Sequence, residues 1–285
     1  MDGYLPGTTY LVGAASGVGK STFVLEKFVY NPLKDYLLGN HQERDPYWIL
    51  FSLEMTRTQV YAKLVSMFIW DTFSEQIRFK EMFSRGDNCR LSDDRYNLMN
   101  SPEVNDFLDI LDQRLFFHEG ALNEATYLKV MDAQLKNFGT FSENTFTPNN
   151  KNQIVGVIID HMSLVKVSPG RGSKKDEIDA ISSVSVRLRN VTKIVSPIHV
   201  AQFNRASNSD ERLKQGMQEP SSADFKDSGA IYEDSSVVLA LFAPNKYHLN
   251  TFHKYDIKTM GQSFVACFLL KSRFGISDLL VPYGF

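Results

Sequence analysis

The sequence has few cysteines and no long apolar run. Its two cysteines, Cys89 and Cys267, lie far apart and form no CxxC pair. This argues against a zinc site or a disulfide framework and fits a reducing compartment. No apolar run approaches the ~20 residues of a membrane span, and the first residues lack the basic and apolar segments of a signal peptide. We therefore expect a cytoplasmic protein without a membrane partner.

An excess of charge is also missing. The chain has 31 Lys and Arg against 33 Asp and Glu, a net charge of -2. The whole molecule is therefore not a basic nucleic-acid binder, and any contact with DNA must come from a local patch. Its 285 residues, 43% of them hydrophobic, suffice for one large domain with a buried core. Because we find no internal repeat or low-complexity tail, we expect a single domain over residues 1–285.

Strand-like apolar segments alternate with helix-like segments along the chain. This order is typical of an α/β fold with a mostly parallel central sheet and helices on both faces. The predicted strands are Thr9–Val12, Trp48–Leu53, Leu115–His118, Ile154–Ile159, Ile198–Gln202, Val237–Phe242 and Phe264–Leu270. The predicted helices are Ser21–Tyr30, Thr58–Trp70, Glu124–Phe138 and Asp176–Ile194.

The polar segments between these elements carry weaker signals. Thr56, followed three residues later by Gln59, predicts a capping box at the start of the second helix. Residues 71–109 are expected to form short helices at the flank of the sheet. Three polar stretches are predicted to be loops, namely Ser142–Gln153, Lys166–Lys175 and Asn204–Ser222.

A glycine-rich segment follows the first predicted strand and precedes the first predicted helix. Residues 13–22 read Gly-Ala-Ala-Ser-Gly-Val-Gly-Lys-Ser-Thr, and this context is that of a phosphate-binding loop, or P-loop. The glycines let backbone N–H groups turn toward phosphates, and the helix N-terminus adds its positive dipole end. Lys20 is expected to reach the β- and γ-phosphates, and Ser21 to hold Mg²⁺. The predicted nucleotide-binding residues are Ala15, Ser16, Gly17, Val18, Gly19, Lys20, Ser21 and Thr22.

Two carboxylates end apolar strands. Glu54 lies in Phe-Ser-Leu-Glu-Met at residues 51–55, and Asp160 closes the run Ile154–Ile159. A charged residue at the carboxyl end of a parallel strand faces the crevice where α/β proteins bind ligands. Glu54 is thus placed to orient or deprotonate a water molecule, and Asp160 to reach the Mg²⁺ shell. The plainer interpretation of each is a solvated residue at a strand end.

Three further segments place polar residues at or after strand ends. They read Ile-His-Val-Ala-Gln-Phe-Asn-Arg (198–205), Ala-Asp-Phe-Lys-Asp-Ser-Gly-Ala-Ile-Tyr-Glu-Asp (223–234) and Phe-Leu-Leu-Lys-Ser-Arg-Phe-Gly (268–275). Each has a plainer interpretation when taken alone. The first contains a Gln that satisfies strand-end hydrogen bonds, the second is a solvated loop, and the third is a basic pair at a strand end. Their joint occurrence, in this order after a P-loop, is the stronger observation.

Taken together, the motifs resemble the RecA-like motor domain of DnaB-type ring helicases, with phage members closest in appearance. Family members commonly have Ala at the position of Ala14, where the general P-loop pattern has Gly, and their second motif is similar to Phe-Ser-Leu-Glu-Met, with the Glu as catalytic base. The resemblance runs from Gly3 to about Gly275. It implies an ATP- and Mg²⁺-dependent DNA helicase that moves along single-stranded DNA during replication, in a bacterial or phage-infected cytoplasm.

The resemblance also implies roles for individual residues. Gln202 corresponds to a sensor of the γ-phosphate, and Asp160 to the family's metal-binding Asp, whereas its neighbour His161 departs from the family pattern and is interpreted as a packing or capping residue. Arg273, assisted by Lys271, corresponds to an arginine finger that reaches a neighbouring subunit's γ-phosphate. The segment that contacts the phosphates of one DNA strand corresponds to Lys226, Asp227 and Gly229.

The expected partners are single-stranded DNA, further copies of the chain in a ring, expected to be a hexamer, and a primase or loader. The family's N-terminal helical domain and linker helix have no counterpart in the sequence, so we expect the motor domain alone. Two alternatives stay open. One is another RecA-like ATPase, a recombinase or clock-type protein; the other is a nucleotide-binding loader or virion component without unwinding activity. Likewise, Lys166–Lys175 is either a second DNA-contacting loop or a solvated surface.

Overall fold

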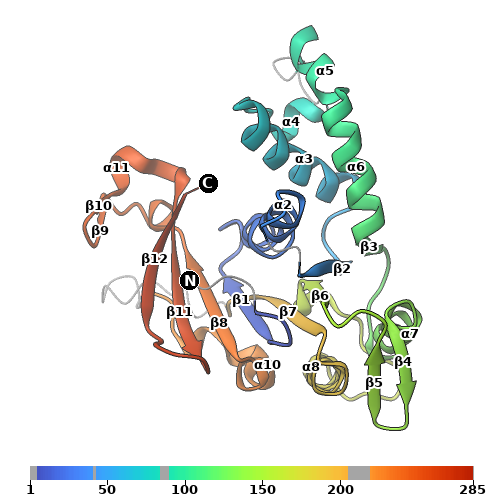
Figure 1. Cartoon of the computed structure of the whole chain (residues 1–285). Helices are drawn as coiled ribbons and strands as arrows, with labels where there is room; N and C mark the ends of the chain where they lie inside the picture. The colour runs from blue at the N-terminus through green and yellow to red at the C-terminus, as the bar shows by residue number, and fades with distance from the viewer. Residues whose placement is uncertain (1–4, 41–42, 84–89, 205–218, 285) are drawn as a thin grey trace.

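The computed structural model describes residues 5–40, 43–83, 90–204 and 219–284, except for the side chains of residues 226–228. Its central feature is an eight-stranded sheet in the order β12-β11-β8-β1-β7-β6-β2-β3 (Figure 1). All neighbours from β8 to β3 pair in parallel, whereas β11 and β12 are antiparallel additions at one edge. The predicted mostly parallel α/β fold is confirmed.

The strands of this sheet lie close to the predicted apolar runs. Both β1 and β6 are buried along their whole length, because a parallel sheet covered on both faces has no polar side. The edge strand β12 was not predicted, since only one of its six residues is buried and it contains a proline. The strands are β1 (Tyr10–Ala14), β2 (Asp45–Ser52), β3 (Leu115–His118), β6 (Gln153–Asp160), β7 (Val195–Gln202), β8 (Val237–Phe242), β11 (Phe264–Ser272) and β12 (Leu279–Gly284).

Helices cover both faces of the sheet. In Figure 1, α2, α3 and α6 lie on one side, and α7, α8 and α10 lie on the other. Helix α1 continues through a π-helical stretch, η1, into α2, so the predicted first helix is longer than expected. The bounds are α1 (Lys20–Val24), η1 (Leu25–Tyr30), α2 (Asn31–Leu37), α3 (Arg57–Phe73), α4 (Phe79–Met82), α5 (Asp93–Met99), α6 (Pro102–Arg114), α7 (Glu124–Leu135), α8 (Lys174–Thr192), α10 (Gly229–Asp234) and α11 (Ile257–Met260).

The predicted capping box at the start of α3 is confirmed. Thr56 Oγ1 accepts a hydrogen bond from Gln59 N (3.4 Å), and Gln59 Oε1 accepts one from Thr56 N (2.9 Å). The reciprocal bonds satisfy two backbone donors that a helix start leaves free. They also fix the direction in which α3 leaves β2, directly after Glu54.

The prediction that Ser142–Gln153 is a loop was wrong. Strands β4 (Gly139–Ser142) and β5 (Thr145–Pro148) form an antiparallel hairpin in which Phe146 is buried. The Thr-Phe-Thr alternation in β5 is a strand pattern, but the surrounding Asn and Pro residues obscured it. Residues 205–218, within another predicted loop, lie outside the described residues. Within the described part of the chain, no helix is long and apolar enough to cross a membrane.

Candidate nucleotide site

The carboxyl ends of β1, β2, β6 and β7 share one edge of the sheet, because these strands pair in parallel. The segments that leave these ends therefore converge there. They surround a cavity of about 380 Å³. Its lining includes most of the predicted nucleotide-binding and catalytic residues, namely Ser16, Gly17, Gly19, Lys20, Ser21, Thr22, Glu54 and Gln202, together with Met55, Gln59, Lys63, Phe79 and His161.

The P-loop joins β1 to α1 and has the backbone that its glycines allow. Gly17 and Gly19 have φ angles of 69° and 98°, which residues with a side chain rarely adopt. Lys20 is 8% exposed, and its ammonium donates to the Ala15 carbonyl oxygen at 3.3 Å. Burial lowers the pKa of Lys20, while the charges of Asp160 and Glu54 oppose that change. A buried ammonium at the wall of a cavity is suited to bind an anion.

Asp160 lies at the carboxyl end of β6 and is 5% exposed. Burial raises the pKa of its carboxyl group, and a hydrogen bond from Ser21 opposes the change. Its Oδ1 atom is buried and has no hydrogen-bond partner among the described residues. Mg²⁺ in nucleotide sites is commonly held by one or two protein oxygens plus phosphates and water. The Ser21 hydroxyl lies beside the Asp160 carboxylate, whose Oδ1 atom has no hydrogen-bond partner among the described residues. These two oxygens suit such an ion.

Glu54 stands at the mouth of the cavity, with its side chain 60% exposed. Its Oε2 lies 3.8 Å from His161 Nε2, and His161 Nδ1 shares a hydrogen bond of 2.6 Å with Ser163 Oγ. Burial lowers the pKa of His161, so its ring is neutral near pH 7. His161 is 7% exposed and stands at the N-cap position of the short 3₁₀ helix Met162–Leu164, in line with its interpretation as a packing or capping residue. It also lines the cavity beside Glu54.

Lys63 is a cavity residue that the sequence analysis missed. Its Nζ donates to Thr22 Oγ1 at 2.8 Å, and burial lowers its pKa while the Asp160 charge opposes this. A usable signal was present: Gln59 and Lys63 are four residues apart on α3 and therefore share a helix face. Because the capping box starts α3 next to Glu54, that face had to turn toward the same crevice.

Gln202 ends β7 directly opposite Ala14 of β1, which places it beside the start of the P-loop. Its side chain is exposed and lines the cavity. An amide can donate to a phosphate oxygen and accept from another group at the same time. This position suits the predicted sensor.

Lys271 and Arg273 lie at the other end of the strands, where β1 begins and not where it leads into the P-loop. Strand β11 runs antiparallel to β8, so Ser272 pairs with Val237, and Val237 pairs with Tyr10 at the start of β1. Lys271 Nζ donates to the carbonyl oxygens of Tyr232 (2.9 Å) and Glu233 (2.8 Å), and Arg273 Nη2 donates to that of Glu233 (3.0 Å). Both cations thus hold the C-terminal end of α10, and neither reaches the cavity of its own chain.

The predicted DNA-contacting segment is only partly described. The side chains of Lys226 and Asp227 lie outside the described residues. Gly229 opens α10, and open space surrounds the position that a Cβ atom would take. This leaves the backbone accessible to a large group, as close approach of a phosphate requires.

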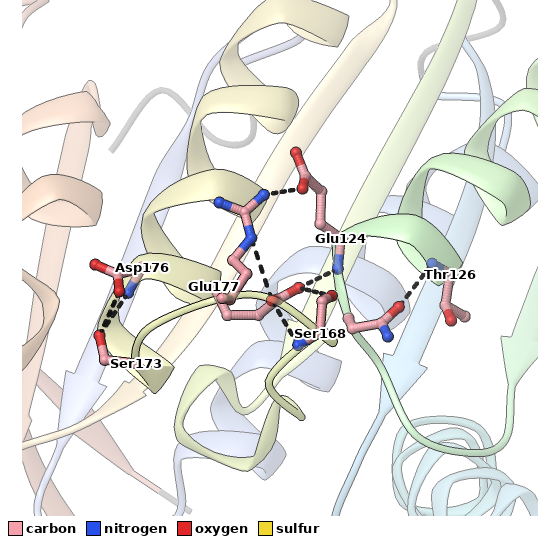
Figure 2. Close-up of polar contacts among 8 residues, drawn as sticks. Glu124, Thr126, Ser168, Ser173, Asp176 and Glu177 are labelled. Atoms are coloured by element: carbon pink, nitrogen blue, oxygen red, sulfur yellow. Dashed lines mark hydrogen bonds and ion pairs between the residues drawn. The ribbon is translucent and has the colours of Figure 1, made fainter.

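The buried carboxylate of Glu177 holds the loop between Asp160 and α8 in place through hydrogen bonds and an ion pair. Glu177, in the first turn of α8, is 0% exposed. It accepts hydrogen bonds from Glu124 N, from Ser168 N (2.9 Å) and from Ser168 Oγ (3.0 Å), and its Oε2 lies 3.4 Å from Arg171 Nε (Figure 2). Arg171 also pairs with the Glu124 carboxylate. Most of Lys166–Lys175 is therefore an ordered loop tied to α7, and α8 begins at Lys174.

The fold is that of the RecA-like P-loop proteins. A family model described as "DnaB-like helicase C terminal domain" matches residues 1–279. The chain belongs to this family, and the expected family membership is confirmed.

Two solved structures have a similar fold. One is described as an ATPase domain and shares 18% identity at a TM-score of 0.69, over 99% of this chain and 83% of that one. The other, "The Structure Of A DnaB-Like Replicative Helicase And Its Interactions With Primase", shares 17% identity at a TM-score of 0.68, over 99% of this chain and 56% of that one. This chain therefore spans just over half of the second protein. No curated protein sequence matches the chain.

The buried contacts of Glu177 lead to a stability prediction. Burial raises the pKa of Glu177, but the hydrogen bonds of Glu124 and Ser168 and the Arg171 charge outweigh it, so the pKa is lowered overall. Glu177→Gln keeps the side-chain volume but turns an NH₂ group toward backbone N–H donors. It should reduce the free energy of unfolding at pH 7 by about 1.5–3 kcal/mol, measured by urea denaturation.

The pH dependence of this loss has a definite sign. A depressed folded-state pKa contributes stability above the carboxyl's unfolded pKa, and this contribution disappears as the pH falls through the folded value. The difference between the unchanged chain and Glu177→Gln should therefore shrink as the pH falls below the ordinary carboxyl range. Asp176→Asn is the matched control, because Asp176 shares the helix turn but is exposed and contacts Ser173. An equal loss in both variants would show that the buried contacts contribute little.

Proposed function

We propose that this chain is the ATP-hydrolysing motor domain of a replicative DNA helicase, with residues 1–285 forming one domain. The observation that carries the proposal is that Lys20, Ser21, Glu54 and Gln202 line one cavity at the carboxyl ends of the strands of a RecA-like sheet, with Asp160 hydrogen-bonded by Ser21. Membership of the DnaB-like helicase family supports the same function.

The residues divide the work of phosphoryl transfer. The backbone N–H groups of residues 15–22 hold the phosphates, and the Lys20 ammonium neutralises charge on the β- and γ-phosphates. Ser21 and Asp160 would hold Mg²⁺, which would supply positive charge to stabilise the transferring phosphate. The P-loop residues Ala15, Ser16, Gly17, Val18, Gly19 and Thr22 complete the binding site.

Glu54 acts on the attacking water. Its exposed carboxylate at the cavity mouth accepts the proton of a water molecule in line with the γ-phosphate. Gln202, between the P-loop and the loop after β7, responds to the presence of that phosphate. The neutral ring of His161 keeps a polar contact beside Glu54 without adding a charge.

Arg273 and Lys271 serve a different copy of the chain. About 13 Å of strand separates the Tyr10 end of β1 from its Ala14 end at ~3.3 Å per residue, and Arg273 lies near the first of these. An arginine at that end of the strands contacts nucleotide only when it faces the cavity of a second chain. We therefore propose a homo-oligomeric ring, expected to be a hexamer, in which Arg273 stabilises charge in a neighbour's site.

The ring would enclose single-stranded DNA, whose phosphates contact Lys226, Asp227 and Gly229. Contacts to the backbone position a strand without reading its sequence, as a translocating motor needs. A primase or a loader is the candidate protein partner, and the bacterial or phage-infected cytoplasm the expected location. Family membership favours this helicase over a recombinase or clock-type ATPase.

Glu54→Gln tests the catalytic assignment. The variant should bind ATP as tightly as the unchanged chain, because the phosphate cradle is intact, yet hydrolyse it about 10²–10⁴-fold more slowly. Phosphate release and equilibrium nucleotide binding are the two measurements. Glu103→Gln, an exposed position on α6, is the control. Undiminished hydrolysis by Glu54→Gln would remove Glu54 from the mechanism, and no hydrolysis by the unchanged chain would leave a nucleotide-binding loader or virion component.

Arg273→Ala tests the action between subunits. The variant should keep ATP binding and lose about 10³-fold or more of its turnover. Mixing it with Glu54→Gln should restore part of the activity, because some interfaces then join an intact Glu54 to an intact Arg273. If the mixture stays as inactive as its components, Arg273 does not act on a neighbouring chain.

A further inference from the structure

Lys246 lies against the P-loop although it belongs to a distant part of the sequence. Strand β8 pairs in parallel with β1, with Leu241 opposite Ala14, so the residues after β8 leave the sheet beside the P-loop (Figure 1). They form the short 3₁₀ helix η5 (Pro244–Tyr247). The Lys246 Nζ atom donates to the Ser16 carbonyl oxygen at 2.7 Å.

The base of this helix is fixed while the ammonium group is accessible. Pro244 is buried, and the Tyr247 ring stacks on Phe242 with centroids 5.0 Å apart. Lys246 N donates to the Ala243 carbonyl oxygen at 3.1 Å, which holds the turn. The Lys246 side chain itself is exposed. Its ammonium group can therefore exchange one acceptor for another without moving the element that carries it.

The same ammonium lies directly beside the backbone of the loop at Gly17. A Cβ atom on Gly17 would lie 2.6 Å from Lys246 Nζ, closer than non-bonded atoms approach. Gly17 has a positive φ angle, and the end of the Lys246 side chain occupies the space beside its Cα atom. That space leaves Lys246 close to the backbone that surrounds the phosphates.

Two ammonium groups, those of Lys20 and Lys246, meet at the P-loop. The Lys246 charge lowers the pKa of Lys20, in addition to the larger effect of burial. Among the residues that the structure describes, no carboxylate forms an ion pair with Lys246. Two ammonium groups beside one loop repel each other, and a bound anion of high charge relieves that repulsion.

The contacts also indicate which phosphate lies nearby. Lys20 Nζ hydrogen-bonds the Ala15 carbonyl oxygen, and Lys246 Nζ hydrogen-bonds that of the next residue, Ser16. The two ammonium groups thus approach the same turn of the loop. Since the P-loop lysine serves the β- and γ-phosphates, a second cation at this turn is expected near the same phosphates.

We propose that Lys246 is a second phosphate-contacting lysine, supplied by the same chain as the P-loop, and that it binds the terminal phosphate of ATP. The inference rests on the proposed function, in which the cavity takes ATP. Two positively charged residues at one nucleotide would then come from different chains. Lys246 belongs to the chain that holds the nucleotide, and Arg273 belongs to its neighbour. The inference also predicts that Lys246 distinguishes ATP from ADP.

The test compares equilibrium binding of ADP and of the slowly hydrolysed analogue ATPγS, both with Mg²⁺, to the full chain and its variants. Lys246→Met should weaken ATPγS binding roughly 10- to 100-fold, as expected for a hydrogen bond to a charged group, and change ADP binding far less. Lys246→Arg should retain most of the ATPγS affinity. Lys258→Met, an exposed lysine on α11, should change neither.

Each other outcome overturns the inference. Equal weakening of both nucleotides would mean that Lys246 only shapes the loop, and unchanged binding would mean that it does not contact phosphate. A melting curve for each variant excludes unfolding as the cause. Because Lys246 is exposed, we expect its variants to remain folded. If the unchanged chain binds neither nucleotide, the proposed function fails and this inference fails with it. If the unchanged chain binds both, only the role of Lys246 is in question.

Discussion

The parallel pairing of β1 with β7 on one side and β8 on the other is the constraint on which the rest of the site depends. Parallel strands bring their carboxyl ends to one edge, so the P-loop, Gln202 and η5 meet although they lie far apart in the sequence. The next strands add Asp160 and Glu54 to the same edge. Hydrophobic burial of these strands therefore provides the energy that gathers polar groups around the cavity.

The two ends of the strands in this sheet have different roles in the proposed mechanism. The carboxyl edge holds the nucleotide cavity, while the antiparallel strand β11 returns to the other edge and carries Lys271 and Arg273 there. These cations hold the C-terminal carbonyls of α10, whose first residue is Gly229 of the proposed DNA-contacting segment. In that mechanism the site of one chain is incomplete alone, and we propose that a neighbouring copy completes it.

Much of this arrangement could be predicted from the sequence, but contacts through space could not. Buried parallel strands such as Gln153–Asp160 are continuous apolar runs, and the P-loop has its own pattern, so the fold and the carboxylates Glu54 and Asp160 were within reach. His161 and Lys246 belong to no such pattern, and Lys63 is indicated only by its spacing from Gln59 on α3. Lys63 and His161 line the cavity, and Lys246 contacts the P-loop, because α3 begins and β6 and β8 end beside it. The β4–β5 hairpin was missed because its strands are short and lie among turn-forming residues.

The most direct test of the account is the rate of ATP hydrolysis per chain as a function of protein concentration, with and without single-stranded DNA. A site completed by a neighbouring chain predicts a rate per chain that rises steeply with concentration and increases further when single-stranded DNA is added. Turnover that is independent of concentration and unaffected by DNA, or no turnover at all, would contradict a motor whose catalytic sites lie between subunits.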